Sequence, residues 1–395
     1  MKIHRPLAEA CVPILEAVFS RGRVLDHEVA TAFRTNRQWG KRDRHFIADS
    51  VWEVVRWRRA LGFVAGSDAI EDMLGVVWKR QGYEIPDWWS GRIGDRGERE
   101  ARLAHQPRAV RESIPDWLDE AGFEQMGERW ETTLASLNRR APVYLRTNRL
   151  SGGRDELLRW LSERGVVAEA VDRLPDGIRL DQTLPRTLGQ EGRFEIQDGG
   201  SQMVAPFLGV EPGMRVIDTC AGAGGKTLHL AALMEGRGEI VAMDVSRRKL
   251  DELWRRAKRA GVRNLKIEHW SATSLARWRG WADRVLIDAP CSGLGTLRRQ
   301  PDLKWRLDEA GLAKIQRTQR RMLDHHPELL RDGGTFVYAT CSVLPSENER
   351  QAAALLERDP RWELEEEQQV DPATTDFDGF YMARFSRKSV SAILS

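Results

Sequence analysis

A short apolar run that leads to an acid or a thiol occurs four times in the second half of this chain, and this pattern constrains the fold most. The runs are 216–217 before Asp218, 240–243 before Asp244, 285–287 before Asp288 and 336–338 shortly before Cys341. Continuously apolar strands separated by helical segments are typical of a parallel sheet with helices on both faces. Ligands of such sheets bind beyond the carboxyl ends of the strands. The sequence therefore predicts an α/β domain whose site lies at that edge.

The first of these strands runs into a glycine-rich turn, Asp-Thr-Cys-Ala-Gly-Ala-Gly-Gly-Lys-Thr, over residues 218–227. A phosphate-binding loop of the Walker type needs a glycine five residues before its lysine, and that position is Ala221. Asp244 ends the next strand about 20 residues after the turn, the spacing of an acid that accepts hydrogen bonds from a ribose. An adenosyl ligand without phosphates therefore fits better than ATP or NAD.

The third strand runs into an acid and a thiol three residues apart, Asp288 and Cys291, with a proline between them. A second thiol, Cys341, follows the fourth strand. This arrangement indicates an acid and two nucleophile candidates at the same sheet edge. Arg298, Arg299 and Lys304 follow the first thiol and are predicted to hold phosphates, the alternative being ordinary surface charge.

Composition excludes several classes of protein. The four cysteines, at 11, 220, 291 and 341, are too few for a disulfide framework in 395 residues, and no CxxC pair indicates a zinc site. No apolar window approaches the length of a membrane span, and the start of the chain does not resemble a signal peptide. We therefore expect a cytoplasmic protein without a metal. The net charge of +3 argues only weakly for an anionic partner.

The first half of the chain indicates two further modules. Residues 1 to 135 show helical periodicity, clearest over 47–61, and the segment 34–45 is interpreted as a basic loop that contains Trp39. Such a loop is typical of RNA-binding surfaces, although a solvated turn between helices has the same composition. Residues 136–205 alternate between short strands and a helix, which predicts a small α/β module.

Several motifs closely resemble the RsmB/Sun family of RNA cytosine-5 methyltransferases. The family's donor loop is similar to 220–227, its Asp-Ala-Pro-Cys-Ser-Gly to 288–293, and its Arg-Arg-x-Pro-Asp-x-Lys-Trp to 298–305. Its Thr-Cys-Ser followed by Glu-Asn is similar to 340–342 with 347–348. Two segments depart from the family: Gly222-Ala223 replaces Ala-Pro, and Ser271-Ala272 replaces an Asp that contacts the adenine.

The resemblance implies a three-part organisation. It predicts a NusB-like RNA-binding domain over 1–135, an RRM-like module over 136–205 and a Rossmann-like class I methyltransferase domain over 206–388. The implied methyl donor is S-adenosyl-L-methionine, and the implied partner is RNA. A monomer is expected.

The resemblance also assigns roles to the site residues. Cys341 is the expected nucleophile, Cys291 assists release of the product, Asp288 hydrogen-bonds the cytosine, and Lys226 favours the thiolate. The residues expected to contact the donor are Cys220, Ala221, Gly222, Ala223, Gly224, Gly225, Lys226, Asp244, Ser271 and Asp288. Those expected to contact RNA are Arg298, Arg299, Lys304, Arg37, Lys41, Arg42 and Arg44.

Three functions remain open at this point. The leading one is methylation of cytosine in ribosomal RNA, because NusB-like domains accompany the ribosomal branch of the family. The same chemistry on tRNA is the second, and a non-catalytic RNA-binding assembly factor is the third. The Pro-Cys at 290–291 alone would also suit a DNA cytosine methyltransferase, where that cysteine attacks, whereas the Thr-Cys at 340–341 is typical of the RNA enzymes.

Overall fold

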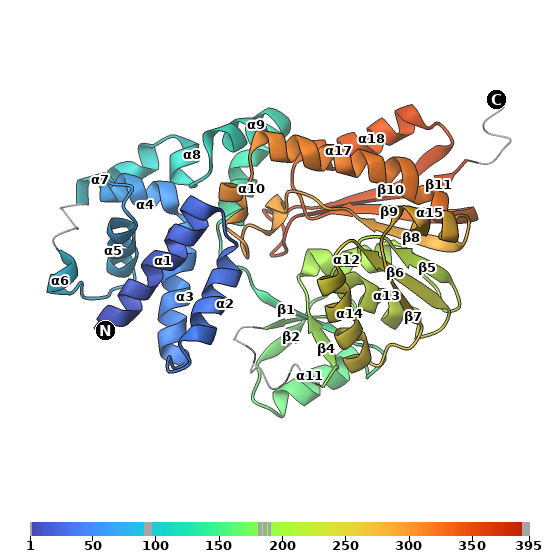
Figure 1. The fold of residues 1–395 in the computed structure, drawn as a ribbon, viewed down its shortest axis with the longest axis horizontal. Helices are drawn as coiled ribbons and strands as arrows, with labels where there is room; N and C mark the ends of the chain where they lie inside the picture. Colours follow the sequence, from blue (N-terminus) through green and yellow to red (C-terminus); the bar gives the residue numbers. More distant parts are fainter. Residues whose placement is uncertain (1, 91–96, 181–183, 185–187, 189–190, 389–395) are drawn as a thin grey trace. The chain divides into compact units, whose positions relative to one another are not determined.

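The computed structural model describes residues 2–90, 97–180, 184, 188 and 191–388, and the described chain forms two compact units (Figure 1). The first unit comprises Met1–Arg139 together with Thr296–Gly311. The second comprises Arg140–Gly295 together with Leu312–Ser395. The chain therefore leaves the second unit just after the first thiol loop and returns to it 16 residues later.

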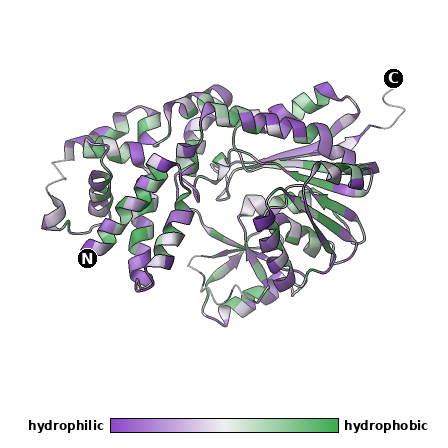
Figure 2. Ribbon diagram, in the orientation of Figure 1, coloured by the Kyte–Doolittle hydropathy of each residue, from purple (hydrophilic) through white to green (hydrophobic). Residues whose placement is uncertain are grey.

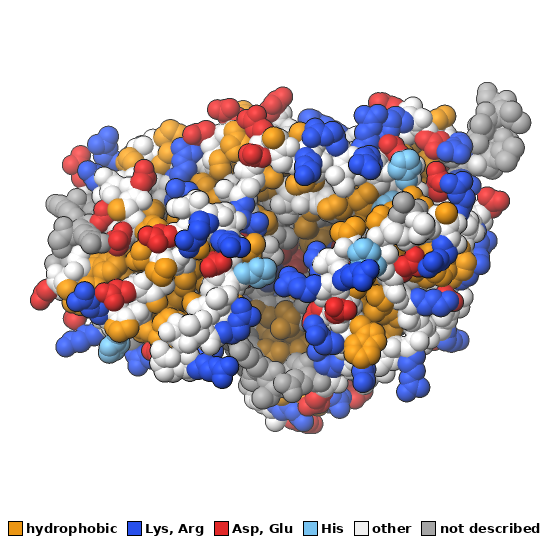
Figure 3. Space-filling model, in the orientation of Figure 1, with side chains coloured by type: hydrophobic (Ala, Val, Ile, Leu, Met, Phe, Trp, Pro, Cys, Tyr) orange, Lys and Arg blue, Asp and Glu red, His pale blue; other side chains and the backbone are white. Residues whose placement is uncertain are grey.

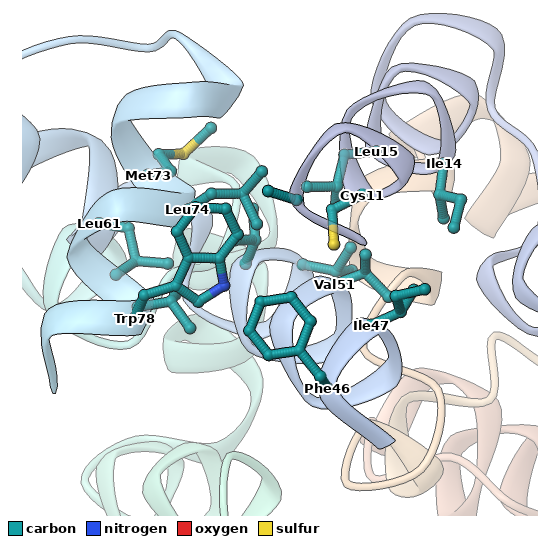
Figure 4. Packing of buried hydrophobic residues seen from close by; sticks show 14 of the residues in the cluster. Cys11, Ile14, Leu15, Phe46, Ile47, Val51, Leu61, Met73, Leu74 and Trp78 are labelled. Carbon is teal, nitrogen blue, oxygen red and sulfur yellow. The ribbon is translucent and has the colours of Figure 1, made fainter. Parts of the chain in front are cut away.

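The first unit is helical, as the sequence predicted. Its helices are α1 Arg5–Arg21, α2 Leu25–Thr35, α3 Lys41–Arg56, α4 Arg58–Ala65, α5 Ile70–Arg80, α6 Asp87–Ser90, α7 Gly97–Arg102, η1 Leu103–His105, α8 Arg108–Arg111, α9 Asp116–Met126, α10 Arg129–Leu137 and α16 Leu303–Arg306. Figure 4 shows the core between α1, α3, α4 and α5, where Cys11, Ile47 and Trp78 are fully buried. The indole of Trp78 donates to Ser50 Oγ at 2.8 Å, so its polar atom is satisfied inside the core.

The predicted basic loop over 34–45 is largely wrong. Helix α2 continues to Thr35 and α3 begins at Lys41, which leaves only 36–40 as a connection. The Asp43 carboxylate accepts a hydrogen bond from Gly40 N at 2.8 Å, so an acid in the first turn caps the start of α3. Lys41, Arg42 and Arg44 consequently lie on a helix.

The segment Thr296–Gly311 packs into the first unit through its cationic side chains. Arg298 is 3% exposed and donates from Nε to Ser136 O at 2.8 Å. Lys304 is 0% exposed, and its ammonium donates to Arg56 O at 2.8 Å and Asn138 Oδ1 at 3.3 Å. Side chains this buried cannot reach a phosphate, so the prediction that Arg298 and Lys304 hold RNA is wrong within this structure. They connect this segment to the helices instead.

The second unit contains the predicted small α/β module. It consists of β1 Val143–Thr147, α11 Arg154–Ser162, β2 Ala168–Ala170, β3 Gly177–Leu180 and β4 Phe194–Ile196. The strands form an antiparallel sheet in the order β2-β3-β1-β4. Glu195 on β4 is paired with Arg256 at 2.7 Å, which fastens the module to the neighbouring sheet domain.

The larger sheet has seven strands in the order β10-β11-β9-β8-β5-β6-β7. Its strands are β5 Arg215–Asp218, β6 Glu239–Asp244, β7 Leu265–His269, β8 Ala282–Asp288, β9 Leu330–Thr340, β10 Trp362–Val370 and β11 Phe380–Arg387. The helices are α12 Gly199–Phe207, α13 Gly225–Leu233, α14 Arg247–Arg259, α15 Ala272–Trp278, α17 Glu309–His325 and α18 Glu349–Arg358, with the short turns η3 Leu294–Thr296, η4 His326–Leu329 and η5 Pro345–Glu347. Figure 2 shows hydrophobic central strands and a strongly hydrophilic α14.

The register of this sheet confirms that the predicted strands share one carboxyl edge. Strands β5 to β9 pair in parallel, with Asp218 opposite Leu286 and Asp288 opposite Ala339. The carboxyl ends that carry the three acids and Cys341 therefore lie along one edge. Strands β10 and β11 pair antiparallel beyond β9 and were not predicted. Among the described residues, no helix is long and apolar enough to cross a membrane.

We predict a pH signature of the buried Lys304. Burial, with the nearby charge of Arg56, lowers the pKa of Lys304 from 10.5 to about 7 in the folded protein. Between these values the unfolded chain binds a proton that the folded chain does not. Lys304 therefore makes the free energy of unfolding increase with pH across this window, by at most about 1.4 kcal/mol per pH unit.

The measurement compares wild type with Lys304→Met by urea titration, followed by tryptophan fluorescence, at pH 7.5 and 9.5. The variant replaces the amine with an apolar side chain of similar length, so the stability difference between the two proteins should change with pH. Parallel pH profiles would contradict the prediction.

Candidate active site

The turn between β5 and α13 forms a loop whose shape requires glycine. Gly222 and Gly224 have φ of 56° and 91°, in the left-handed region that glycine adopts readily. A Cβ on Gly224 would lie 2.1 Å from the side chain of Leu253. At Gly222 no atom lies within 4 Å of where a Cβ would stand. The loop backbone at Gly222 therefore borders open space that a ligand could fill.

Asp218 stabilises this loop through buried hydrogen bonds. It is 1% exposed, and its carboxylate accepts from Thr227 Oγ1 at 2.7 Å and from Cys220 N at 3.4 Å. Burial raises the pKa of Asp218 to about 7. Burial and the neighbouring carboxylates also raise the pKa of Cys220, which disfavours its thiolate. Cys220 is therefore a part of the loop and a poor nucleophile.

Asp244 lies against the glycine loop. Its two carboxylate oxygens accept from Gly222 N at 2.9 Å and Ser246 N at 2.7 Å. Each oxygen keeps a second lone pair, so the side chain can still accept from ligand hydroxyls. The open space at Gly222 and this carboxylate fit the adenosyl part of S-adenosyl-L-methionine. A contact between Asp244 and the ribose remains a prediction.

Ser271 lies at the same edge, since Asp244 pairs with His269 two residues before it. It is the N-cap of α15, and its exposed hydroxyl lies 2.9 Å from Thr273 Oγ1 and 3.1 Å from Ser274 Oγ. A contact between this hydroxyl and an adenine remains a prediction.

Lys226, in the first turn of α13, forms an ion pair with Asp288 at the end of β8. Lys226 Nζ lies 2.6 Å from Asp288 Oδ2 and 5.1 Å from the centre of the Phe380 ring. Burial alone would lower the pKa of Lys226, but the charge and hydrogen bond of Asp288 outweigh it and raise that pKa. Lys226 is therefore a firmly protonated cation inside the site.

The two thiols meet beside this ion pair. The sulfurs of Cys291 and Cys341 are 3.3 Å apart, although the residues are 50 positions apart in sequence. The contact with Cys341, together with burial, raises the pKa of Cys291. The positive charge of Lys226 interacts with Cys341. The predicted catalytic residues are thus brought together at one end of the sheet.

The predicted RNA-binding cations differ in their exposure. Arg37, Lys41 and Arg42 are exposed, whereas Arg44 donates to Trp39 O at 2.9 Å. Arg299 is partly buried, and its carbonyl accepts from the Trp52 indole at 3.5 Å. All of them belong to the first unit, while the thiols belong to the second.

Sequence reasoning missed two buried groups that support the site. Arg146 on β1 is 1% exposed, and its guanidinium donates to Gln197 Oε1 and to Gly225 O at the start of α13. Glu347 is 0% exposed and binds both thiol loops. A lone arginine in a strand gives no signal in a sequence. Glu347 lies in one of the motifs noted above, but its role could not be seen there.

Within the described residues, no group of three or more His, Cys, Asp and Glu side chains is arranged to hold a metal ion. The parallel sheet, the glycine loop and the acid after the second strand define a class I S-adenosylmethionine-dependent methyltransferase domain. Residues 205–386 match the family model "16S rRNA methyltransferase RsmB/F", and residues 114–187 match the ferredoxin-like domain of RsmF/B-like methyltransferases.

Relatives support the same assignment. "Ribosomal RNA small subunit methyltransferase B" of Citrobacter koseri is 33% identical over 73% of this chain and 68% of its own length. The protein of that name from Klebsiella pneumoniae is 34% identical over 69% of this chain and 66% of its own length, so the match spans about two thirds of these relatives. The chain belongs to the RsmB/F family of S-adenosylmethionine-dependent RNA methyltransferases. The solved structure of PH0851 has the same fold, with a TM-score of 0.80, 22% identity and coverage of 98% of this chain and 100% of its own.

We predict that Asp244→Asn weakens binding of S-adenosyl-L-methionine by about 1.5–3 kcal/mol, because it removes charge-assisted hydrogen bonds to the ribose. Titration calorimetry with the donor measures this directly. Asp251→Asn, an exposed change on α14, serves as the control and should leave the affinity unchanged. Equal affinity of the folded Asp244→Asn variant and wild type would exclude the ribose contact.

Proposed function

We propose that this chain methylates carbon 5 of a cytosine in RNA through a covalent adduct with Cys341. The observation that carries the proposal is the contact between two thiols beside the Lys226–Asp288 ion pair, at the sheet edge that also holds the donor loop. Carbon 5 of cytosine is too weakly nucleophilic to accept a methyl group unaided. Addition of a thiolate to carbon 6 makes carbon 5 nucleophilic, which is why this chemistry needs a cysteine.

The two thiols of this site act at the start and at the end of the reaction. The Cys341 thiolate forms a bond to carbon 6, the π bond between carbons 5 and 6 breaks, and its electron pair moves to carbon 5. S-adenosyl-L-methionine supplies an electrophilic methyl group when bound. After transfer, a base removes the carbon-5 proton, the ring double bond forms again and the bond between carbon 6 and Cys341 breaks. Cys291, in contact with Cys341, can donate its S–H to the departing sulfur.

Asp288 suits recognition of cytosine. Its carboxylate is held by Lys226 and can accept a hydrogen bond from the exocyclic amine of the base. Uracil has an acceptor at that position, so the same carboxylate would disfavour it. The base must leave its stack to reach the site, as in a loop or a flipped-out nucleotide.

Exposed cations on both units support RNA as the partner. In the second unit, α14 carries the exposed Arg247, Arg248, Lys249 and Lys258, and Trp254 on the same helix is 58% exposed. Lys258 Nζ lies 5.5 Å from the Trp254 ring. Figure 3 shows Lys and Arg side chains gathered over this helix. Cations around an accessible aromatic ring are suited to phosphates and unstacked bases.

Ribosomal RNA is the substrate that we propose, because the relatives of this chain are named as ribosomal RNA methyltransferases. Bisulfite sequencing of total RNA from a deletion strain and its complemented counterpart tests the proposal. A cytosine that loses methylation in the deletion strain and regains it on complementation identifies the target. A site in tRNA would instead support the second function, and no change in any RNA would refute methylation of carbon 5.

The two thiols should behave differently when replaced. Cys341→Ala should abolish methylation without trapping RNA, because no bond to carbon 6 can form. Cys291→Ala should still attack and transfer the methyl group but stall before release, and therefore accumulate a protein–RNA adduct. Denaturing electrophoresis with donor and target RNA distinguishes the two. If Cys341→Ala gave the adduct and Cys291→Ala did not, the roles would be reversed.

Exposed cations of the first unit should contribute to RNA affinity. Replacing Arg37, Lys41 and Arg42 with Gln should weaken binding and flatten its salt dependence, by roughly 0.7 in the log–log slope for each lost phosphate contact. The control removes the same charge from α17 with Arg317→Gln, Arg320→Gln and Arg321→Gln. If the slope stayed the same, or changed equally in the control, these three cations would not be a specific RNA contact.

A further inference from the structure

Glu347 is a fully buried carboxylate that the chemistry above does not use. Its Oε1 accepts from Ser292 N at 2.8 Å and from Gln319 Nε2 at 3.0 Å. Its Oε2 accepts from Ser292 Oγ at 2.5 Å and from Ser342 Oγ at 2.5 Å. These four donors fill the acceptor sites of an ionised carboxylate.

The two serines link this carboxylate to both thiols. Ser292 directly follows Cys291 at the end of β8, and Ser342 directly follows Cys341 at the end of β9. The serine hydroxyls are 3.2 Å apart, and the sulfurs beside them are 3.3 Å apart. One side chain therefore holds the two loops at a fixed spacing.

We propose that Glu347 is a positioning residue: acting through Ser292 and Ser342, it joins the two thiol loops and keeps the sulfurs of Cys291 and Cys341 in contact. The consequence for catalysis rests on the covalent mechanism proposed above. The role of Glu347 in the spacing of the sulfurs does not depend on that mechanism, so the spacing and the mechanism can be tested separately. Glu347 does not act as a base on the substrate, because it is buried and its acceptor sites are occupied by the protein.

The charge of Glu347 adds a chemical effect to the geometric one. The hydrogen bond with Cys341 and burial raise the pKa of Cys291, and the negative charge of Glu347 raises it further. The cation of Lys226 interacts with Cys341 instead. Cys291 therefore interacts with the negative charge of Glu347, whereas Cys341 interacts with the positive charge of Lys226. The anion favours the protonated form of Cys291, which can then act as the S–H donor.

The first test measures the spacing of the sulfurs without RNA or donor. Phenylarsine oxide binds tightly only where two thiols can reach one arsenic, and a Cys291→Ser protein gives the one-thiol baseline. Glu347→Ala should lose at least about tenfold of the wild-type affinity, toward that baseline, because the loops separate. Glu349→Gln removes a carboxylate two residues away and should bind like wild type. Donor affinity shows that each variant is folded.

Two further variants, Glu347→Gln and Ser342→Ala, test the proposal if Glu347→Ala does not fold. Glu347→Gln can accept from the two N–H donors and donate to the serine hydroxyls, so it should keep the arsenical affinity but shift the pH profile of Cys291 alkylation to lower pH. Ser342→Ala removes the link from the other side. If Glu347 acts through the serines, Ser342→Ala should weaken arsenical binding in the wild-type background and add little to Glu347→Ala.

Each outcome decides the matter. Folded Glu347→Ala with wild-type arsenical affinity, or Ser342→Ala and Glu347→Gln that both match wild type in every readout, would overturn the proposal. Loss of arsenical affinity in Glu347→Ala would support it, even if the Cys341→Ala experiment showed that the covalent mechanism was wrong.

Discussion

Parallel pairing of β8 with β9 is the constraint on which the site depends. Asp288 lies opposite Ala339, so the segments that follow these two strands leave the sheet side by side. Backbone bonds extend the pairing past the strands: Ala289 N donates to Ala339 O, and Gly295 N donates to Cys341 O at 2.9 Å. A Cβ on Gly295 would lie 2.8 Å from Cys341 O and 2.1 Å from Gly379 O, so a larger residue would push this loop away from the Cys341 loop and from the segment before β11. Two thiols distant in sequence are in contact because the paired strands place the segments that follow them side by side.

The two thiols interact with opposite charges. Lys226, held by Asp288, approaches from the donor side and interacts with Cys341, whereas Glu347 approaches from the side of α17 and α18 and interacts with Cys291. Neither charge is free to move, because Lys226 is ion-paired and Glu347 binds four donors. A covalent cycle needs one sulfur that attacks as a thiolate and another that remains protonated. Within the covalent mechanism proposed above, the negative charge of Glu347 favours Cys291 as the sulfur that remains protonated.

The sequence predicted the parts of this structure that depend on local patterns. Apolar runs located β5, β6, β8 and β9, and the end of each run located the acids and Cys341. It did not predict β10, since Glu363 to Gln369 is mostly polar and pairs at the sheet edge, where burial does not require an apolar pattern. It also missed β11, although that strand lies inside the sheet and most of its residues are apolar and buried. The buried contacts of Glu347 were also missed, because only long-range packing brings Ser292 and Gln319 to it.

The error over Lys304 shows why charge is ambiguous in a sequence. Arg298 and Lys304 follow a catalytic motif closely, which favoured phosphate binding, but the chain enters the helical unit at Thr296 and buries both side chains there. Burial favours the neutral form of a lysine, and the pKa of Lys304 is lowered to about 7, so much of its charge is lost at neutral pH. Its amine acts mainly as a hydrogen-bond donor to Arg56 O. The segment 288–305 is therefore divided between the two units. Its residues up to Gly295 belong to the unit that holds the thiols, and those from Thr296 onward pack into the helical unit.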